Sequence, residues 1–479
     1  MRYRWARGGT MKGGKMVRAW RIVGVNWMLL TLFFVGVPSF VHADINDILL
    51  KFYPYVMVQE EYSNNIFLSP NQSRTSDYIT TVYPGLRFFD LKPGAYGIDL
   101  DVSGGYNYYA KNNDFSYWGF QGRLNSWYAL TSNLNFRLRD YIIRSDAARE
   151  NQYQNLYNPE GQYIGNTLPD QYLFSTARGV QAIYVRNVVE PSLEYRFGRE
   201  NLVSLLYRNN IYHNENPLFE NSTENSISPL LNYWFDIHNG ITLEYLITFG
   251  HYQVSNDTLA QTVRSRYTYR VDPKLSLFGQ FVFLNEHYIG PTADYNAYTP
   301  SGGVEYRFSP TLTGTLQGGY FWQKADDNSE TTGPFFNVSL TQRSQETIYT
   351  LSLNGGYTQD YFDAQNLGFI KYYQAYGTIN HYFTARLSGQ LTGSIGKTWY
   401  PSESDNRKDW IWDTRAGVSY MLFQWLTLSL EAAYRGANSN IPSNDYTEFS
   451  AIFRITLARP GYQPGMMGGP SFGPTSTYR

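Results

Sequence analysis

Leu426-Thr-Leu-Ser-Leu-Glu-Ala-Ala-Tyr434 places an apolar residue at every second position, with mostly polar or small residues between them. The same period of two recurs in Ile241–Phe249, Leu312–Tyr320 and Leu387–Ile395. Such alternation predicts β-strands with one apolar and one polar face. Each strand is expected to be about 9–12 residues long, which matches a tilted strand that crosses a membrane.

The composition agrees with strands that cross a membrane. Aromatic residues make up 18% of the 479-residue chain and charged residues only 16%, whereas about a quarter of a usual globular domain is charged. The mean hydropathy is −0.43, so no bundle of hydrophobic helices is hidden in the chain. Strands of a transmembrane β-barrel expose apolar groups on one face only, which keeps the average polar.

Net charge and cysteine content exclude several other classes of protein. The net charge of −1 gives no support to nucleic-acid binding. The chain has no cysteine, which excludes disulfides, thiol catalysis and cysteine-based metal sites.

Tyrosine recurs at a near-constant step, each time at the end of a predicted strand and before a tight turn. The steps are 38, 36, 37, 76 and 38 residues, a period in the range of repeat architectures. The repeating unit is a pair of strands, and amphipathic rings favour the membrane interface. We therefore predict an aromatic girdle at the periplasmic rim, formed by Tyr195, Tyr233, Tyr269, Tyr306, Tyr382 and Tyr420.

The connections between strands fall into two classes. Short ones such as Asp90–Gly94 and Gly198–Asn201 alternate with longer polar ones such as 402–408. Short periplasmic turns and longer outer loops are typical of outer-membrane barrels. We predict an all-β fold: a transmembrane antiparallel up-and-down β-barrel of about 20 strands (18–20) over residues 54–458. A soluble propeller or a secreted sandwich fits less well, because neither predicts aromatic residues at one end of so many strands.

The amino terminus has the pattern of an export signal. A basic stretch precedes the apolar run Ile22–Val37, and Val41-His-Ala43 resembles a cleavage site. The alternative is a membrane anchor, but the apolar run is shorter than the ~20 residues that a spanning helix needs. We predict a signal peptide over residues 1–43, a periplasmic lead over 44–53 and a location in the outer membrane of a Gram-negative bacterium.

Two further segments lack strand alternation. Residues 146–183 form a connection far longer than usual, which could fold into the pore, cap the surface or be a disordered outer loop. Residues 459–479 are rich in Pro and Gly, a composition that does not pack a core, so we expect a disordered periplasmic tail. Docking of this tail to a periplasmic partner is the alternative.

Proline recurs inside descending strands. Pro84, Pro191 and Pro229 each stand four residues before a boundary aromatic residue. Proline lacks the donor of a ladder hydrogen bond, so these positions predict a bulge or a local interruption of pairing.

The face opposite the apolar positions should line the lumen, and it is rich in arginine. A wall of this kind attracts anions, but arginines can also pair with carboxylates on neighbouring strands and brace the barrel. Two clusters, 137/139 and 264/266/270, have no obvious inward acid in their own strand. The candidate basic strip comprises Arg137, Arg139, Arg264, Arg266, Arg270 and Arg307.

The sequence contains no pattern that indicates catalytic activity. Five histidines follow the signal segment, none of them at metal-ligand spacing, and no nucleophile-elbow or zinc-protease motif occurs. We predict a protein without enzymatic activity, catalytic residues, metal or cofactor.

Two kinds of segment resemble a known family. Glu60-Glu-Tyr-Ser-Asn-Asn-Ile-Phe67 and Ser76–Leu86 are similar to the start of the putative beta-barrel porin 2 family, and Arg186–Gly198 and Gly303–Pro310 resemble its descending strands. This family overlaps outer-membrane proteins associated with exopolysaccharide and PEP-CTERM loci. The resemblance implies an outer-membrane barrel that serves as exit channel or accessory in polysaccharide secretion. Most outer-membrane barrels end on an aromatic residue, and the tail here departs from that pattern.

Three functions follow from these observations. The chain is expected to be a channel or accessory for exopolysaccharide export whose arginine-rich lumen favours anionic solutes. The alternatives are a general diffusion porin for small solutes and a non-conducting, surface-structural barrel. Expected partners are outer-membrane lipid, the barrel-assembly machinery, and possible contacts with polysaccharide and periplasmic export components.

Overall fold

A computed structural model describes residues 45–146, 181–217, 219–359, 369–401 and 406–460. The chain divides into two units, residues 1–52 and 53–479. In the first unit the described part holds the short helix α2, Ile45–Leu49, which lies in the predicted lead segment. Among the described residues, no helix is long and apolar enough to cross a membrane.

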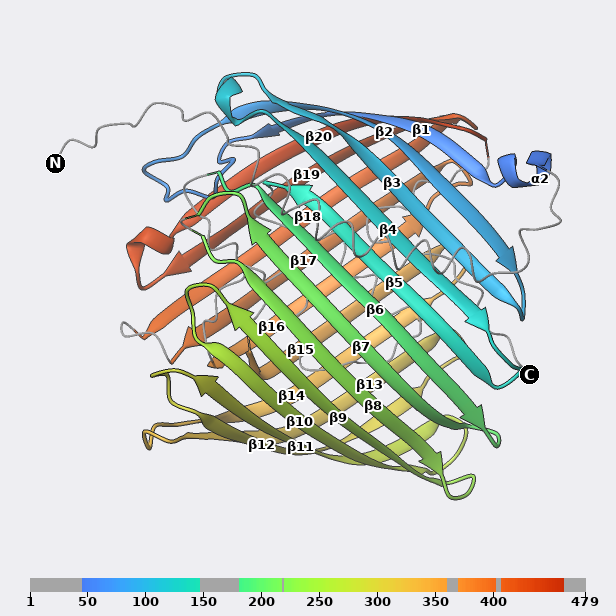
Figure 1. Cartoon of the computed structure of the whole chain (residues 1–479), viewed down its shortest axis with the longest axis vertical. Coiled ribbons are helices and arrows are strands. Elements are labelled where there is room, and N and C mark those ends of the chain that lie inside the picture. Colours follow the sequence, from blue (N-terminus) through green and yellow to red (C-terminus); the bar gives the residue numbers. More distant parts are fainter. Residues whose placement is uncertain (1–44, 147–180, 218, 360–368, 402–405, 461–479) are drawn as a thin grey trace. The chain divides into compact units, whose positions relative to one another are not determined.

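The second unit is a single sheet of 20 strands (Figure 1). The strands are β1 Phe52–Ser63, β2 Asp77–Lys92, β3 Tyr96–Tyr109, β4 Tyr117–Ala129, β5 Leu134–Ser145, β6 Tyr184–Phe197, β7 Asn201–Asn214, β8 Ser222–Trp234, β9 Asn239–Tyr252, β10 Asp257–Arg270, β11 Leu275–Ile289, β12 Tyr295–Arg307, β13 Leu312–Ala325, β14 Glu330–Arg343, β15 Thr347–Gln359, β16 Phe369–Tyr382, β17 Leu387–Tyr400, β18 Arg407–Phe423, β19 Leu426–Ser439 and β20 Tyr446–Ala458. Two 3₁₀ turns, η2 Asn113–Phe115 and η5 Pro442–Asn444, lie in the connections.

The sheet is antiparallel throughout and closes on itself. Each strand pairs with its neighbours in sequence, and β20 pairs with β1 from Tyr55↔Ala458 to Ser63↔Ser450. A closed sheet has no edge with unpaired backbone groups, which is the condition for strands to cross a membrane. The predicted up-and-down barrel of about 20 strands is therefore confirmed, with its first strand beginning at Phe52.

The connections differ at the two ends of the barrel as predicted. Turns such as 93–95, 198–200 and 344–346 join even strands to the next odd strand, whereas the opposite end carries longer loops such as 64–76 and 146–183. The short turns are the periplasmic ones.

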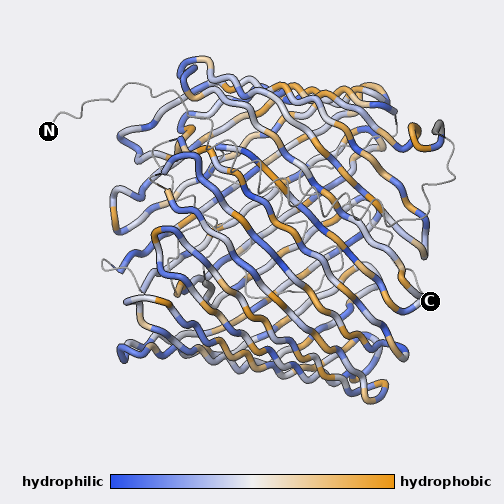
Figure 2. Tube along the Cα trace, viewed as in Figure 1, coloured by the Kyte–Doolittle hydropathy of each residue, from blue (hydrophilic) through white to orange (hydrophobic). Residues whose placement is uncertain are grey.

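Hydropathy alternates along nearly every strand (Figure 2). The apolar positions are the exposed ones: Val263 in β10, Leu391 in β17 and Leu430 in β19 are 41%, 49% and 56% exposed. Large apolar side chains on the outside of a barrel contact lipid. The polar positions between them consequently face the lumen.

The six tyrosines of the predicted girdle do not all face the same side of the barrel wall. Five of the six, Tyr195, Tyr233, Tyr269, Tyr306 and Tyr420, are exposed on the outer face near the periplasmic turns. Tyr382 differs because it stands opposite Ser388, a buried lumen-facing residue. The odd-numbered residues of β16 face outward, so Tyr382 has the wrong parity, and the exposed aromatic residue at this turn is Phe383.

Proline interrupts the ladder without shifting its register. The pairs to one neighbouring strand are missing at residues 83–84, 190–191 and 228–229, and pairing resumes in the same register beyond each gap. In β12 the pairs with β13 are likewise missing at residues 299–300, which include Pro300, and pairing resumes in the same register. The predicted interruption is confirmed, and no bulge accompanies it.

Three predicted segments fall wholly or mainly outside the described residues. These are the signal peptide over 1–43, the long connection 146–183 beyond its ends, and the tail 459–479 beyond residue 460. They remain predictions.

Two adjacent glycines of β13 allow a test of how closely the backbones of β12 and β13 approach at residues 299–300, where the ladder pairs are missing. A Cβ at Gly319 would lie 2.3 Å from the carbonyl oxygen of Pro300, whereas nothing lies within 4 Å of a Cβ at Gly318. We predict that G319A lowers the free energy of unfolding by about 1–3 kcal/mol, and that G318A changes it by about 0.5 kcal/mol or less. Urea unfolding in lipid, followed by the gel mobility of the folded barrel, measures both. Equal midpoints for the two variants would contradict the assignment.

Candidate functional site

The lumen wall is the candidate functional site, and its first feature is a lattice of ion pairs. On β5, Arg137 Nη2 lies 3.4 Å from Glu194 Oε2, and Arg139 Nε lies 3.3 Å from Glu190 Oε2. Both glutamates belong to β6, the neighbouring strand. Each is shared with a second arginine, because Arg208 lies 3.5 Å from Glu190 and Arg196 lies 3.9 Å from Glu194.

The arginines of β10 are paired in the same way. Arg264 Nη1 donates to Glu244 Oε2 of β9 at 2.6 Å, and Arg266 pairs with Glu305 of β12. Arg270 pairs with Glu200 in the β6–β7 turn. The acidic partner thus lies on the neighbouring strand for Arg264, two strands away for Arg266 and in a more distant turn for Arg270.

Arg307, the sixth residue of the predicted basic strip, is different. It is exposed at the periplasmic end of β12. Its guanidinium has no ion pair within the part of the chain that the structure describes. Five of the six arginines are thus held in ion pairs, and Arg307 is the one without an ion pair among the described residues. Solute contact by any of them remains a prediction.

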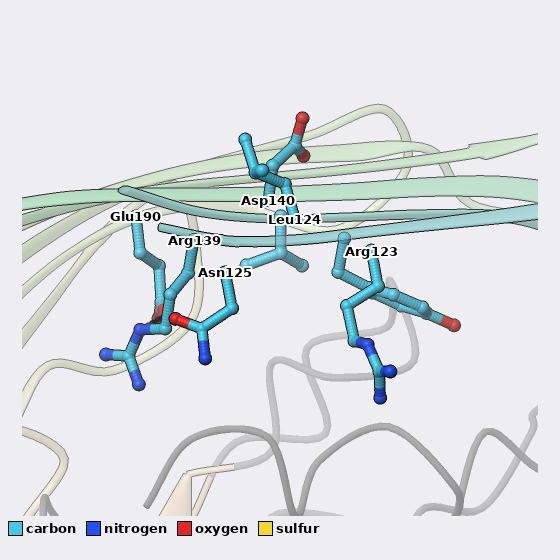
Figure 3. Close-up of a pocket in the computed structure, with 8 residues that line it drawn as sticks. Arg123, Leu124, Asn125, Arg139, Asp140 and Glu190 are labelled. Atoms are coloured by element: carbon cyan, nitrogen blue, oxygen red, sulfur yellow. Dashed lines mark ion pairs between the residues drawn. The ribbon is translucent and has the colours of Figure 1, made fainter. Parts of the chain in front are cut away.

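The lattice contains a cavity of about 20 Å³ between β4, β5 and β6. Figure 3 shows Arg123, Asn125, Arg139 and Glu190 projecting from one side of the wall, while Asp140 points to the other. A cavity of this size holds about one water molecule. It is too small for a solute, so the lumen itself is the site to consider.

A second group of ion pairs lies where the barrel closes. Asp413 accepts from Arg415, its Oδ2 lies 3.5 Å from Arg435, and Arg435 Nε donates to Glu448 at 2.7 Å. Ser63 Oγ of β1 donates to Glu448 Oε1 at 2.6 Å. This chain of contacts joins β18, β19, β20 and β1 across the closing seam.

The opposite part of the wall carries hydroxyl and amide groups instead of charges. Thr378 contacts Thr392 at 3.2 Å, and Gln317 donates to Ser301 at 2.9 Å. Arg343 is the only charged residue at the described lumen-facing positions of β13–β17. The polar residues at those positions include Thr313, Thr315, Gln317, Asn337, Ser339, Thr341, Thr350, Ser352, Asn354, Gln374, Thr378, Asn380, Ser388, Gln390, Thr392 and Ser394.

The sequence analysis did not identify this hydroxyl-and-amide wall, because it considered only the charged inward residues. The signal was present in the same alternation that predicted the strands. Leu312–Tyr320 and Leu387–Ile395 carry Thr, Gln and Ser at the inward positions.

The ladder between β14 and β15 is incomplete at the outer end of the barrel. Pairing covers only Phe336–Arg343 against Ile348–Gly355. Beyond it, Glu330–Phe335 pair with β13 alone and Gly356–Gln359 pair with β16 alone. The two strands therefore separate above this point.

Aromatic side chains from the separated hairpin pack inside the barrel. The rings of Tyr357 and Phe369 lie 5.2 and 6.0 Å from Phe321, a lumen-facing residue of β13. Phe369 also lies 5.5 Å from Tyr295 of β12, and Thr299 donates to Tyr357 Oη. The outer end of the β15–β16 hairpin thus bends into the lumen and narrows its mouth. The possible constriction that the sequence located in 146–183 lies almost wholly outside the described residues and stays a prediction.

The histidines take structural contacts rather than converging on one site. His238 Nδ1 contacts the backbone oxygen of Arg270, His251 pairs with Asp257, and His287 pairs with Asp294. Within the described ranges, no cluster of three His, Asp or Glu residues could hold a metal ion.

This fold and lumen define a porin-type β-barrel of the bacterial outer membrane. Residues 252–459 match the model of the family described as "Putative beta-barrel porin 2", which confirms the resemblance over the barrel from the end of β9 to β20. No curated protein matches the chain in sequence.

Solved structures of other outer-membrane barrels are similar to this chain at low identity. *Pseudomonas aeruginosa* OpdK with vanillate shares 11% identity, covering 86% of this chain and 99% of that one, with a TM-score of 0.40. A BenF-like porin from *Pseudomonas fluorescens* Pf-5 shares 9% identity, with coverages of 86% and 100% and a TM-score of 0.43. *P. aeruginosa* OprD shares 13%, with coverages of 85% and 96% and a TM-score of 0.37. Similarity at this level carries no information on the solute.

Glu190 offers a test of the ion-pair lattice. Its side chain is 4% exposed and touches both Arg139 and Arg208, so E190Q leaves two arginines short of a counter-charge. We predict a loss of about 3 kcal/mol in unfolding free energy together with a shift of the reversal potential toward anions. E305Q is the matched control, because Glu305 is 45% exposed and an exposed pair contributes about 1 kcal/mol or less. Equal losses of unfolding free energy in E190Q and E305Q would contradict the prediction that the buried pair stabilises the fold more than the exposed pair.

The periplasmic rim offers a pH test. Arg270 donates to Glu200 at 2.7 Å and holds the pKa of Glu200 below its ordinary 4.5. Because the folded pKa is depressed, the pair stabilises the fold above the unfolded pKa, and this contribution is lost as pH falls through the folded pKa. Glu200 is half exposed, so we predict that E200Q is less stable by about 0.5 kcal/mol at pH 7. The two proteins should unfold at the same midpoint at about pH 2, and a gap that persists there would refute the linkage.

Proposed function

We propose that this barrel is an outer-membrane channel or accessory for exopolysaccharide export. The observation that carries the proposal is the hydroxyl-and-amide wall of β13–β17, which faces the lumen. Hydroxyl and amide groups both donate and accept hydrogen bonds, so they match the hydroxyl groups of a saccharide.

The ion-pair lattice refines the expected charge preference. An arginine with a bound carboxylate attracts anions less than a free one, because the two charges largely cancel in the surrounding field. The preference for anionic solutes should therefore be weak and should arise mainly from cations such as Arg307, which has no ion pair among the described residues. An acidic polysaccharide is compatible with this wall, but a neutral one is too.

A polar wall of this kind supports passage of a saccharide without tight binding. Conduction requires sites that are favourable enough to enter and weak enough to leave. Hydroxyl and amide contacts exchange readily with water, since each contributes only about 0.5–1.5 kcal/mol net.

The second candidate is a general diffusion porin for small solutes, and the match of residues 252–459 to a porin family favours it. The cavity between β4, β5 and β6 is no larger than one water molecule, so it does not argue for a specific cargo. A non-conducting surface barrel is the third candidate.

The test is block of the single-channel current by oligosaccharides in planar bilayers. A variant that exchanges three wall hydroxyls for methyl groups, T350V/T378V/T392V, should weaken the block by about tenfold, since each lost contact contributes about 0.5–1.5 kcal/mol. T414V is the matched control, because Thr414 is exposed on the outer side of β18. Conductance without any block by saccharides favours the general diffusion porin. Absence of conductance contradicts both channel functions.

Deletion of the gene separates the two channel functions in the cell. Loss of secreted polysaccharide with unchanged uptake of small solutes supports the export function. Unchanged polysaccharide with slower uptake contradicts it and supports the diffusion porin.

A further inference from the structure

The outer side of β16, β17 and β18 carries a checkerboard of lysine and aromatic residues near the outer ends of the strands. In one row of the ladder, Lys371 pairs with Trp399, and Trp399 pairs with Lys408. In the next row, Tyr373 pairs with Lys397, and Lys397 pairs with Trp410. Every lysine thus has aromatic side chains beside it. We call these six residues the lysine–aromatic face.

Most of this face lies on the lipid side of the barrel, at the border of the apolar band. Lys371 is at its edge: it lies at the gap between β14 and β15, and its Nζ is also 5.9 Å from the ring of the lumen-facing Phe321. Leu391 and Ile395 occupy the same parity of β17 and are 49% and 51% exposed. Trp399 is four residues beyond Ile395, next to the end of β17, and Trp410 is 49% exposed. Aromatic rings at this height mark a membrane–water interface.

Two of the three lysines, Lys397 and Lys371, are in contact with aromatic rings. Lys397 Nζ lies 5.1 and 5.2 Å from the ring centroids of Trp399 and Trp410. Lys371 Nζ lies 5.7 Å from the rings of both Tyr373 and Trp399. Cation–π contacts at such distances hold an ammonium in place without neutralising its charge.

None of the three lysines has a carboxylate within ion-pair distance in the part of the chain that the structure describes. Lys371 donates to the backbone oxygen of Thr332 at 2.9 Å, which uses one of its three N–H donors. In the lumen, by contrast, most predicted cations have an acidic partner. Three ammonium groups with no acidic partner among the described residues create a local positive field at a lipid interface, which attracts anionic headgroups.

We propose that the lysine–aromatic face binds the phosphorylated headgroup of a glycolipid in the outer leaflet. The three ammonium groups would contact the phosphates. The rings of Tyr373, Trp399 and Trp410 would pack against the sugar and the first carbons of the acyl chains. Phe336 of β14 stacks on Tyr373 at 5.8 Å and extends the apolar part of this surface. The proposal is independent of what passes through the lumen.

The test compares lipids that differ only in phosphate. The full chain in detergent is titrated with diphosphorylated lipid A and with the same lipid after removal of its phosphates, and bound lipid is counted by native mass spectrometry. We expect the intact protein to favour the phosphorylated lipid. K371Q/K397Q/K408Q should lose on the order of tenfold to a hundredfold of that preference, as three lysines near an anionic surface predict.

Two further variants separate the face from charge in general. K371R/K397R/K408R keeps the charges and should keep the preference. K111Q/K274Q/K324Q removes the same number of charges from lysines elsewhere on the chain and should also keep it. An unchanged preference in the K371Q/K397Q/K408Q variant, or an equal loss in the K111Q/K274Q/K324Q control, overturns the proposal.

Folding and ligand identity are controlled separately. The gel mobility of the folded barrel verifies each variant, and the single variant K397Q, with a severalfold loss expected, replaces the triple variant if that one does not fold. Excess inorganic phosphate should leave the bound lipid in place. Complete displacement by inorganic phosphate would assign the face to free anions and contradict the proposal.

Discussion

The structure depends on one constraint: backbone N–H and C=O groups that cross lipid must be hydrogen-bonded within the chain. The pairing of β20 with β1 meets this constraint by leaving no edge strand. Closure also creates only two environments for side chains, lipid and lumen. A period of two in the sequence is then sufficient to assign nearly every strand residue to one of them. Glu448, held by Arg435 of β19 and Ser63 of β1, adds side-chain contacts where first and last strands meet.

Closure brings strands together whose charges are complementary. Glu190 and Glu194 of β6 stand beside Arg139 and Arg137 of β5, so an arginine-rich wall becomes a wall of pairs. Burying a pair with both partners present avoids the large cost of an isolated charge. The hydroxyl-and-amide wall on the other side needs no such pairing. The lumen thus has two chemically different halves, and the proposed saccharide contact rests on the uncharged one.

The ladder of backbone hydrogen bonds between strands is interrupted at positions where the residue type makes the interruption less costly. At Pro191 and Pro229 no N–H is left without an acceptor, because proline has none. The larger separation of β14 and β15 follows the same logic. Pro334 stands on the stretch of β14 that pairs with β13 but not with β15, and the Lys371 ammonium donates to the carbonyl of Thr332 in place of a partner on β15. Tyr357 and Phe369 then fill the space inside the wall with buried rings. Side chains therefore take over from backbone pairing at this point, and they also shape the mouth of the lumen.

The sequence by itself determined the barrel, its strand count, the two classes of connection and the face of most residues, because alternation and turn composition are local properties. Five of the six predicted girdle tyrosines are exposed near the short turns, but the parity of Tyr382 could not be predicted, since an offset of one residue in a repeat is invisible without the register. Only the tertiary structure decided the partners of Arg264, Arg266 and Arg270, because their acids lie on other strands or turns. It alone revealed the inward bend of the β15–β16 hairpin and the lysine–aromatic face, since both depend on residues that register, not sequence proximity, brings together.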